Sequence, residues 1–275
     1  MANEQQPIGV FDSGYGGLTV LRDIVKLLPQ YDYIYLGDNA RAPYGSRSFD
    51  TVYQYTLEAV KWFFSQGCKL VILACNTASA KALRTIQQHD LAALGEDKKV
   101  LGVIRPTAEI VGDLTVSGHV GVLGTTGTVE SGSYLLEIEK FFPGTVVNQQ
   151  ACPMWVPLIE NGEMDSEGAR YFIRKDLGEL LLKDSRIDTI LLACTHYPLL
   201  AEQLKAILPA KISLISQGNI VALSLKDYLK RHPEVEERCS KNGKIDFYTT
   251  DDTDNFNHHG ALFFGSPITS RHIDW

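Results

Sequence analysis

Two cysteines occur in closely similar settings, and their thiols could carry acid–base or nucleophilic chemistry. Lys69–Cys75 and Asp188–Cys194 are apolar runs that both end in Ala-Cys, 119 residues apart. Polar residues and then apolar residues at helical spacing follow each cysteine, which predicts a strand, a short loop and a helix. A thiol with a pKa of about 8.5 is only about 3% ionised at pH 7. A helix N-terminus or a neighbouring base favours the thiolate, so both cysteines are candidate acid–base groups or nucleophiles.

A glycine-rich loop is the next candidate for ligand binding. Asp12–Gly17 contains three glycines and follows the apolar run Ile8–Phe11. Glycines at a strand end allow the backbone to come close to a ligand. The loop lacks the Lys-Ser/Thr ending of a Walker motif, and it departs from GxGxxG. Tyr44 lies between a proline and a glycine in a second turn-rich stretch, a position that fits either a surface turn residue or a backbone contact to a ligand.

Few other side chains stand out as catalytic candidates. His196 lies two residues beyond Cys194 and shares its loop, whereas Glu160, taken alone, is interpreted as a surface carboxylate. The sequence has five cysteines, no CxxC pair and no Cys–His spacing typical of a metal site, which predicts free thiols and no bound metal. Three of the thiols are interpreted as non-catalytic: Cys68, Cys152 and Cys239.

The elements that must position these residues alternate between two kinds. Amphipathic stretches such as Thr51–Gln66, which predicts a helix that ends near Gly67, separate short apolar runs. This alternation predicts βαβ units and a mostly parallel sheet, whose strands are buried on both faces. Strands are expected at Ile8–Phe11, Tyr33–Leu36, Leu70–Ala74, Val100–Ile104, His119–Leu123, Thr189–Ala193 and Ile212–Ile215.

The chain also repeats itself weakly, beyond the pair of cysteine runs. Ile8–Gly14 is similar to Val120–Thr126, 112 residues later. Two similar offsets favour two related α/β halves. Both cysteines would then lie at carboxyl ends of strands, where open α/β sheets bind their ligands.

Composition limits the classes of function. The 275 residues are 44% hydrophobic and 21% charged, with a net charge of −7. This balance is ordinary for a soluble globular protein and gives no chain-wide attraction to nucleic acid or an anionic membrane. The longest apolar run, Leu70–Cys75, is far too short to span a bilayer, and Met1–Pro7 has no signal-peptide core. We therefore expect a soluble, cytoplasmic protein with no nucleic-acid and no membrane partner.

Taken together, these motifs resemble those of glutamate racemases, within the aspartate/glutamate racemase superfamily. The resemblance extends from about Ile8 to Gly265 and is carried by Asp12–Leu18, Pro43–Gly45, Ala74–Ser79, Gly121–Thr128 and Ala193–Leu199. It implies an α/β fold of two pseudo-symmetric domains, each a mostly parallel sheet flanked by helices, with the active site at the domain interface. The expected domains are residues 1–100 plus 214–275, on the Cys75 side, and 101–213, on the Cys194 side.

The resemblance also implies an activity. It indicates a cofactor-independent interconversion of L- and D-glutamate, which supplies D-glutamate for peptidoglycan, with Cys194 taking the proton from L-glutamate and Cys75 from D-glutamate. Asp12 is then the partner of Cys75, and His196 and Glu160 assist Cys194. Glutamate is the expected small-molecule partner, and a homodimer is left open. The implied substrate contacts are Asp12, Ser13, Tyr44, Gly45, Asn76, Thr77, Thr126, Thr195 and His196.

Two positions depart from the family pattern, and three alternative functions stay open. Ser216–Asn219 stands where many members carry an Asp-led motif, and Arg105 stands where a carboxylate or small residue is common. A first alternative is a racemase of another acidic amino acid, such as aspartate. A second is a Cys–His hydrolase with Cys194 as nucleophile and His196 as base. A third is a non-catalytic, two-lobed amino-acid binder.

Overall fold

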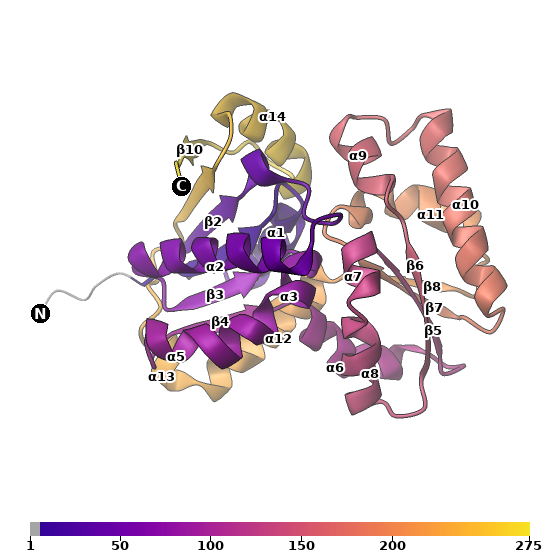
Figure 1. The fold of residues 1–275 in the computed structure, drawn as a ribbon, viewed down its shortest axis with the longest axis horizontal. Helices are drawn as coiled ribbons and strands as arrows, with labels where there is room; N and C mark the ends of the chain where they lie inside the picture. The colour runs from indigo at the N-terminus through magenta and orange to yellow at the C-terminus, as the bar shows by residue number, and fades with distance from the viewer. Residues whose placement is uncertain (1–5) are drawn as a thin grey trace, which may run out of the picture.

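Two parallel sheets, each flanked by helices, form the two lobes of the computed structural model, which describes residues 6–275 (Figure 1). The first sheet has the order β10-β9-β2-β1-β3-β4 and the second the order β6-β5-β7-β8. Every strand pairing in them is parallel. The strands are β1 (Ile8–Asp12), β2 (Tyr33–Gly37), β3 (Leu70–Leu73), β4 (Lys99–Gly102), β5 (His119–Gly124), β6 (Val146–Ala151), β7 (Thr189–Ala193), β8 (Ser213–Ile215), β9 (Ile245–Thr249) and β10 (Ser270–His272).

All seven predicted strands are present; β7 matches its predicted limits, and the others differ at one or both ends by no more than two residues. The largest shift is in β4, which ends at Gly102, because Ile104 already opens a helix. The sequence pattern missed β6, β9 and β10. Both β6 and β10 are edge strands with polar, partly exposed residues, so they lack the continuous apolar run of a buried parallel strand.

Helices connect the strands in the expected alternation. The predicted helix over Thr51–Gln66 is confirmed: α2 begins after Ser48, whose hydroxyl accepts a hydrogen bond from the Thr51 N–H, and Gly67 follows it at a φ of 89°. The helices are α1 (Gly17–Leu27), η1 (Asn39–Arg41), α2 (Phe49–Ser65), α3 (Asn76–Lys81), α4 (Leu83–Thr85), η2 (Ile86–Asp90), α5 (Leu91–Leu94), α6 (Ile104–Leu114), α7 (Thr126–Glu130), α8 (Ser133–Phe141), α9 (Trp155–Glu160), α10 (Glu167–Lys183), η3 (Tyr197–Leu200), α11 (Ala201–Ile207), α12 (Gly218–Arg231), α13 (Pro233–Glu236) and α14 (Thr253–Phe264).

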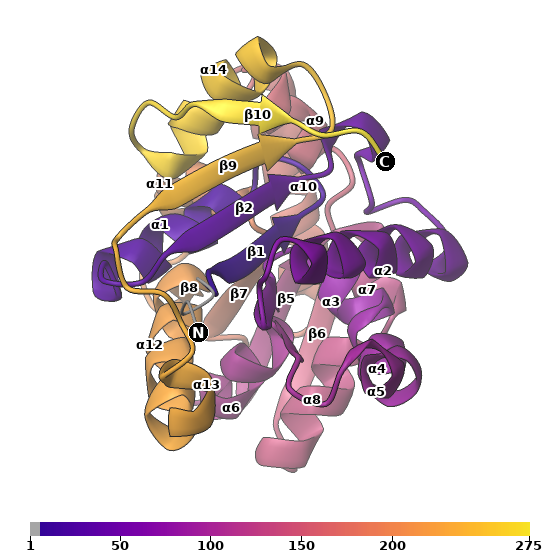
Figure 2. The same ribbon diagram turned by 90° about the vertical axis from the view of Figure 1, so that its left-hand side faces the viewer.

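Each sheet is buried on both faces, which explains its apolar strands. In the first lobe, residues of α1, α12 and α14 pack on one face, and residues of α2 and α3 pack on the other (Figure 2). In the second lobe, α6 and α8 cover one face, and α9, α10 and α11 cover the other. Since nonpolar burial is the main source of folding stability, both sheets act as rigid platforms for the loops at their ends.

The two sheets repeat one arrangement, as the internal similarity predicted. The order β2-β1-β3-β4 in the first sheet matches β6-β5-β7-β8 in the second. The chain passes between the sheets after β4, near Val103, and again after β8, near Gln217. These crossings lie three residues beyond the expected limit at 100 and four beyond the limit at 213, and the two limits cut through β4 and β8. The domain limits themselves stay a prediction.

No helix within residues 6–275 is both long and apolar enough to cross a membrane.

Candidate active site

The candidate residues collect at the carboxyl ends of two adjacent strands in each sheet. In the first sheet, β1 ends at Asp12, and the neighbouring β3 is followed by Cys75. In the second, β5 leads into Thr126, and β7 is followed by Cys194. The strand order reverses between β1 and β3 in the first sheet and between β5 and β7 in the second. Open α/β sheets usually bind their ligands at this point.

Cys75 is buried at the start of α3. Its Sγ accepts a hydrogen bond from the Ala78 N–H at 3.4 Å and lies 3.6 Å from the Ser13 Oγ. The side chain is only 5% exposed. Burial, assisted by the negative charge of Asp12, raises the pKa of Cys75 to about 12. In the substrate-free protein Cys75 is therefore a protonated thiol at neutral pH.

Cys194 lies in a chain of three polar side chains. The His196 Nδ1 is 4.0 Å from its Sγ, and the His196 Nε2 is 2.9 Å from the Glu160 Oε1. Glu160, the last residue of α9, is therefore not the isolated surface carboxylate that its sequence context alone indicated. The helix expected directly after Cys194 begins later, because Tyr197–Leu200 forms a 3₁₀ turn and α11 starts only at Ala201.

His196 is placed to act as a buried cation. Burial by itself would lower the pKa of His196, but the Cys194 sulfur and the Glu160 carboxylate, which lie on either side of the ring, raise it to about 10. A protonated imidazole at neutral pH stabilises a thiolate beside it. The two thiols therefore differ in their neighbours: Cys194 has the His196 imidazole beside it, whereas Cys75 has the carboxyl of Asp12 nearby.

The Asp12–Ser13 dipeptide joins the two cysteine loops. Ser13 lies against Cys75, while the Asp12 Oδ1 accepts a hydrogen bond from the Thr195 Oγ1 at 3.4 Å. The Asp12 Oδ2 accepts one from the Gly14 N–H at 3.0 Å. Burial raises the pKa of Asp12, although the positive charge of His196 opposes the shift. A cationic group of a ligand beside Asp12 would lower its pKa and stabilise the carboxylate.

Close approach between the two lobes explains a glycine in this loop. A Cβ on Gly16 would lie 2.2 Å from the Thr195 Oγ1 and 2.4 Å from the His196 Nδ1. Any side chain there would collide with the loop that carries Cys194. The Thr19 Oγ1, one turn further along α1, also donates a hydrogen bond to the Thr195 carbonyl at 2.9 Å.

The remaining predicted substrate contacts lie where hydrogen bonds join the two lobes on the Cys75 side. The Thr77 Oγ1 lies 2.9 Å from the Thr125 Oγ1, and the Gly127 N–H donates to the Gly45 carbonyl at 2.8 Å. Thr126 is the first residue of α7 and is partly buried. The Tyr44 hydroxyl donates to the buried carboxylate of Asp38, so Tyr44 offers a ligand its backbone rather than its phenol.

The structure adds residues that the sequence analysis did not select. Thr125 and Asp38 hold Thr77 and Tyr44, and Gln217 hydrogen-bonds to Asn76. Thr125 lies inside the Gly121–Thr128 motif, and Gln217 lies inside Ser216–Asn219, both of which the sequence analysis singled out. Asp38, in a Gly-Asp-Asn turn, carried no signal that separated it from an ordinary turn residue.

Within the described residues, the other three thiols make no hydrogen bond to Cys75, Cys194, Asp12 or His196. All five cysteines are free and buried, and those interpreted as non-catalytic are Cys68, Cys152 and Cys239. The Cys239 Sγ is 3.4 Å from the Val235 carbonyl. Within residues 6–275, no group of three or more His, Cys, Asp or Glu side chains is arranged to hold a metal ion.

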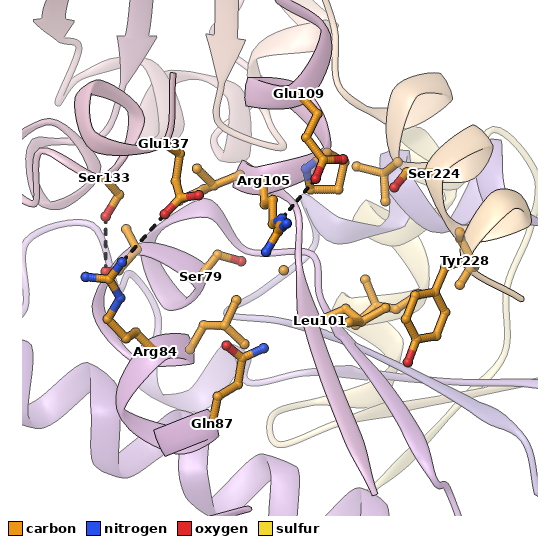
Figure 3. Close-up of a pocket in the computed structure, with 18 of the residues that line it drawn as sticks. Ser79, Arg84, Gln87, Leu101, Arg105, Glu109, Ser133, Glu137, Ser224 and Tyr228 are labelled. Atoms are coloured by element: carbon orange, nitrogen blue, oxygen red, sulfur yellow. Dashed lines mark hydrogen bonds and ion pairs between the residues drawn. The ribbon is translucent and has the colours of Figure 1, made fainter. Parts of the chain in front are cut away.

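A separate cavity of about 640 Å³ opens between the lobes, away from the cysteines (Figure 3). Its lining comes from α3, α4, β4, α6, α8 and α12. Two of its arginines are already paired: Arg84 lies 3.7 Å from Glu137, and Arg105 lies 2.9 Å from Glu109. Arg105, one of the two departures from the family pattern, therefore faces this cavity rather than the cysteine site.

The raised pKa of Cys75 predicts a pH dependence of its reactivity. Below a pKa of about 12 the thiolate fraction grows tenfold per pH unit, so alkylation of Cys75 by iodoacetamide should accelerate about tenfold for each unit from about pH 7 to about pH 9. Peptide mass spectrometry measures the rate in the substrate-free protein. Asp12→Asn, which removes a negative charge, should accelerate alkylation at every pH. A rate that levels off below about pH 9 would contradict the shift.

Comparison with known proteins agrees with this geometry. The Asp/Glu/Hydantoin racemase family matches residues 8–223. Among individual relatives, the chain is 40% identical to a glutamate racemase of Geobacter metallireducens, over 95% of this chain and 93% of the relative.

Solved structures extend the similarity to the whole fold. Glutamate racemase isoform RacE1 of Bacillus anthracis matches with a TM-score of 0.88 and 33% identity, over 98% of this chain and 97% of the other. The glutamate racemase of Francisella tularensis, solved in complex with D-glutamate, matches with a TM-score of 0.86 and 31% identity, over 98% of each chain. The expected two-domain α/β architecture is thereby confirmed.

Proposed function

The chain belongs to the Asp/Glu/Hydantoin racemase family, and from this premise we propose that it interconverts L- and D-glutamate by moving a proton between two opposed cysteines. No cofactor takes part in the proposed reaction. Its product, D-glutamate, would serve peptidoglycan synthesis. Five free thiols fit a reducing compartment, so we place the reaction in the cytoplasm.

One observation carries the proposal. Two buried cysteines lie at equivalent positions in two sheets whose strand orders match, and the Asp12–Ser13 dipeptide contacts both Cys75 and Thr195, the residue next to Cys194. Racemisation removes a proton from one face of Cα and returns a proton to the opposite face. A single base cannot readily reach both faces, whereas two thiols on either side of one substrate can. The duplicated fold supplies that pair.

The proton balance follows from the resting state. The Cys194 thiolate removes the Cα proton of L-glutamate and becomes a thiol, while the Cys75 thiol protonates the opposite face and becomes a thiolate. With Cys75 now the thiolate, the enzyme can remove the Cα proton of D-glutamate. Alternatively, the two cysteines exchange protons with solvent and return to their first state. His196 stabilises the Cys194 thiolate, and Glu160 keeps His196 in its protonated form. Positioned acid–base groups typically contribute about 10²–10⁴-fold to the rate.

The remaining residues orient the substrate and hold developing charge. The buried carboxyl of Asp12 suits the substrate ammonium. The backbone of Tyr44 and Gly45, the side chain of Asn76 and the hydroxyls of Ser13, Thr77, Thr126 and Thr195 are proposed to bind the carboxylates. Orientation and fixed dipoles supply what acid–base transfer alone does not, because the Cα–H of an amino acid is a very weak acid.

A direct assay tests the proposal. The purified protein, without pyridoxal phosphate and after dialysis against EDTA, should convert L-glutamate to a mixture with equal amounts of both enantiomers. Chiral chromatography measures the product, with L-aspartate as the matched substrate one methylene shorter. Faster turnover of aspartate would assign the chain to the aspartate alternative. Activity that requires added metal or pyridoxal phosphate would contradict the cofactor-free reaction.

A second candidate has one observation in its favour. Cys194, His196 and Glu160 stand in the order of a hydrolytic Cys–His–acid triad, with the imidazole between thiol and carboxylate. A hydrolase of this kind would leave Cys75 without a chemical role. The response of activity to Cys75→Ala therefore separates the two candidates.

A further inference from the structure

Gln217 occupies the point where the chain returns from the second sheet to the first. It lies between β8 and α12, and its side-chain Nε2 is 3.2 Å from the carbonyl oxygen of Val103. Val103 is the residue at which the chain first crosses, between β4 and α6. One side chain therefore links both crossings between the two lobes.

The same amide closes a ring of hydrogen bonds with Asn76 and Tyr134. The Asn76 Nδ2 donates to the Gln217 Oε1 at 2.7 Å, and the Gln217 Nε2 donates to the Tyr134 hydroxyl at 2.7 Å. The Tyr134 hydroxyl in turn donates to the Asn76 Oδ1 at 2.6 Å. Each group donates once and accepts once around the ring, so the ring fixes the orientation of both amides.

This ring is buried and well supported. Gln217 and Asn76 are each 3% exposed, and Tyr134 has no exposed surface. The Gln217 Nε2 also lies 2.9 Å from the Thr107 Oγ1, which itself donates to the Val103 carbonyl at 3.0 Å. Inside a protein such hydrogen bonds are strong, and a buried polar group that loses its partner is costly. Asn76 is therefore held in a single orientation.

Asn76 connects the ring to the chemistry. It directly follows Cys75 and is the first residue of α3, while Cys75 caps the same helix through the Ala78 N–H. A change in the orientation of Asn76 therefore changes both a proposed substrate contact and the first turn that carries the thiol.

We propose that Gln217 is a positioning residue that acts through Asn76, a role that rests on the proposed racemisation. Gln217 lies in Ser216–Asn219, where this chain departs from the family pattern. Within this stretch, Gln217 holds a proposed substrate contact. The ring ties that contact to both crossings between the lobes.

A double-mutant cycle tests the proposal. Gln217→Met keeps the length of the side chain but removes its donor and acceptor. It should raise the KM for glutamate roughly tenfold and change kcat less than about threefold. Asn76→Ala should raise KM at least as much, and the double variant should match Asn76→Ala alone. Asn219→Ala, an exposed position two residues away, is the control and should keep wild-type KM and kcat.

Two further measurements keep the outcome decisive. Tyr134→Phe removes only the ring hydroxyl, so it repeats the cycle if Gln217→Met does not fold, and melting temperatures report general damage. The positioning role would be overturned if the KM of a double variant increased by the product of the two single-variant increases. A KM for Gln217→Met within twofold of wild type would overturn it as well. A wild-type protein that does not racemise glutamate would instead overturn the proposed function, and this inference with it.

Discussion

Cys75→Ala and Cys194→Ala should each abolish racemisation in both directions, with kcat lower by at least about a thousandfold. Every turnover needs a base on one face of Cα and an acid on the other, so neither thiol can replace its partner. The expected loss is of the size that a positioned acid–base group contributes. Chiral chromatography from L- and from D-glutamate measures both directions, and circular dichroism checks that each variant is folded.

A matched control separates the pair from cysteine loss in general. Cys239→Ala removes a buried thiol of the first lobe that lies outside the site, and it should leave kcat and KM close to wild type. More than about a tenth of wild-type activity in either Cys75→Ala or Cys194→Ala would contradict two-thiol catalysis. Hydrolytic activity that survives Cys75→Ala but not Cys194→Ala would support the hydrolase candidate.

Local patterns predicted the two sheets because a parallel strand that is buried on both faces appears in the sequence as a continuous apolar run. The runs before Cys75 and Cys194 carry this pattern, and their similarity also indicated the duplication that places each thiol directly after an equivalent strand. The edge strand β6 (Val146–Ala151) does not carry it, because a polar, partly exposed strand resembles a loop.

The partners of the candidate residues were harder to predict, since they depend on packing between distant segments. His196 and Glu160 are 36 residues apart, and they meet only because α9 packs beside the loop after β7. Gln217 reaches Asn76 across 141 positions, through the crossings between the lobes. Single-sequence periodicity reports which face of an element is buried, but it does not report which element lies against that face.

The glycine-rich loop Asp12–Gly17 shows what residue types alone can predict. Its glycines indicated a close approach, and the structure identifies the neighbours as Thr195 and His196. Without the fold, that approach could equally have served a phosphate or a plain turn. The fold therefore identifies what this loop approaches, which is the segment of the second lobe that follows Cys194.

The second prediction with a large expected effect concerns the source of the hydrogen that is added at Cα. When pure L-glutamate reacts in deuterated solvent and is stopped at early conversion, the D-glutamate formed should carry deuterium at Cα almost completely. The recovered L-glutamate should carry almost none. Mass spectrometry after chiral separation measures both pools, and the same experiment from D-glutamate should give the mirror result.

The structure supplies the reason for this asymmetry. With a pKa raised to about 12 by burial and by the nearby Asp12 charge, Cys75 is a thiol before substrate binds, and its hydrogen has exchanged with solvent. It therefore delivers deuterium to the face opposite Cys194, while the hydrogen taken from L-glutamate stays on Cys194. A single base that moved between the faces would return the original hydrogen to some product and wash label into unreacted substrate. Heavily labelled L-glutamate, or largely unlabelled D-glutamate, at early conversion would therefore exclude two opposed cysteines.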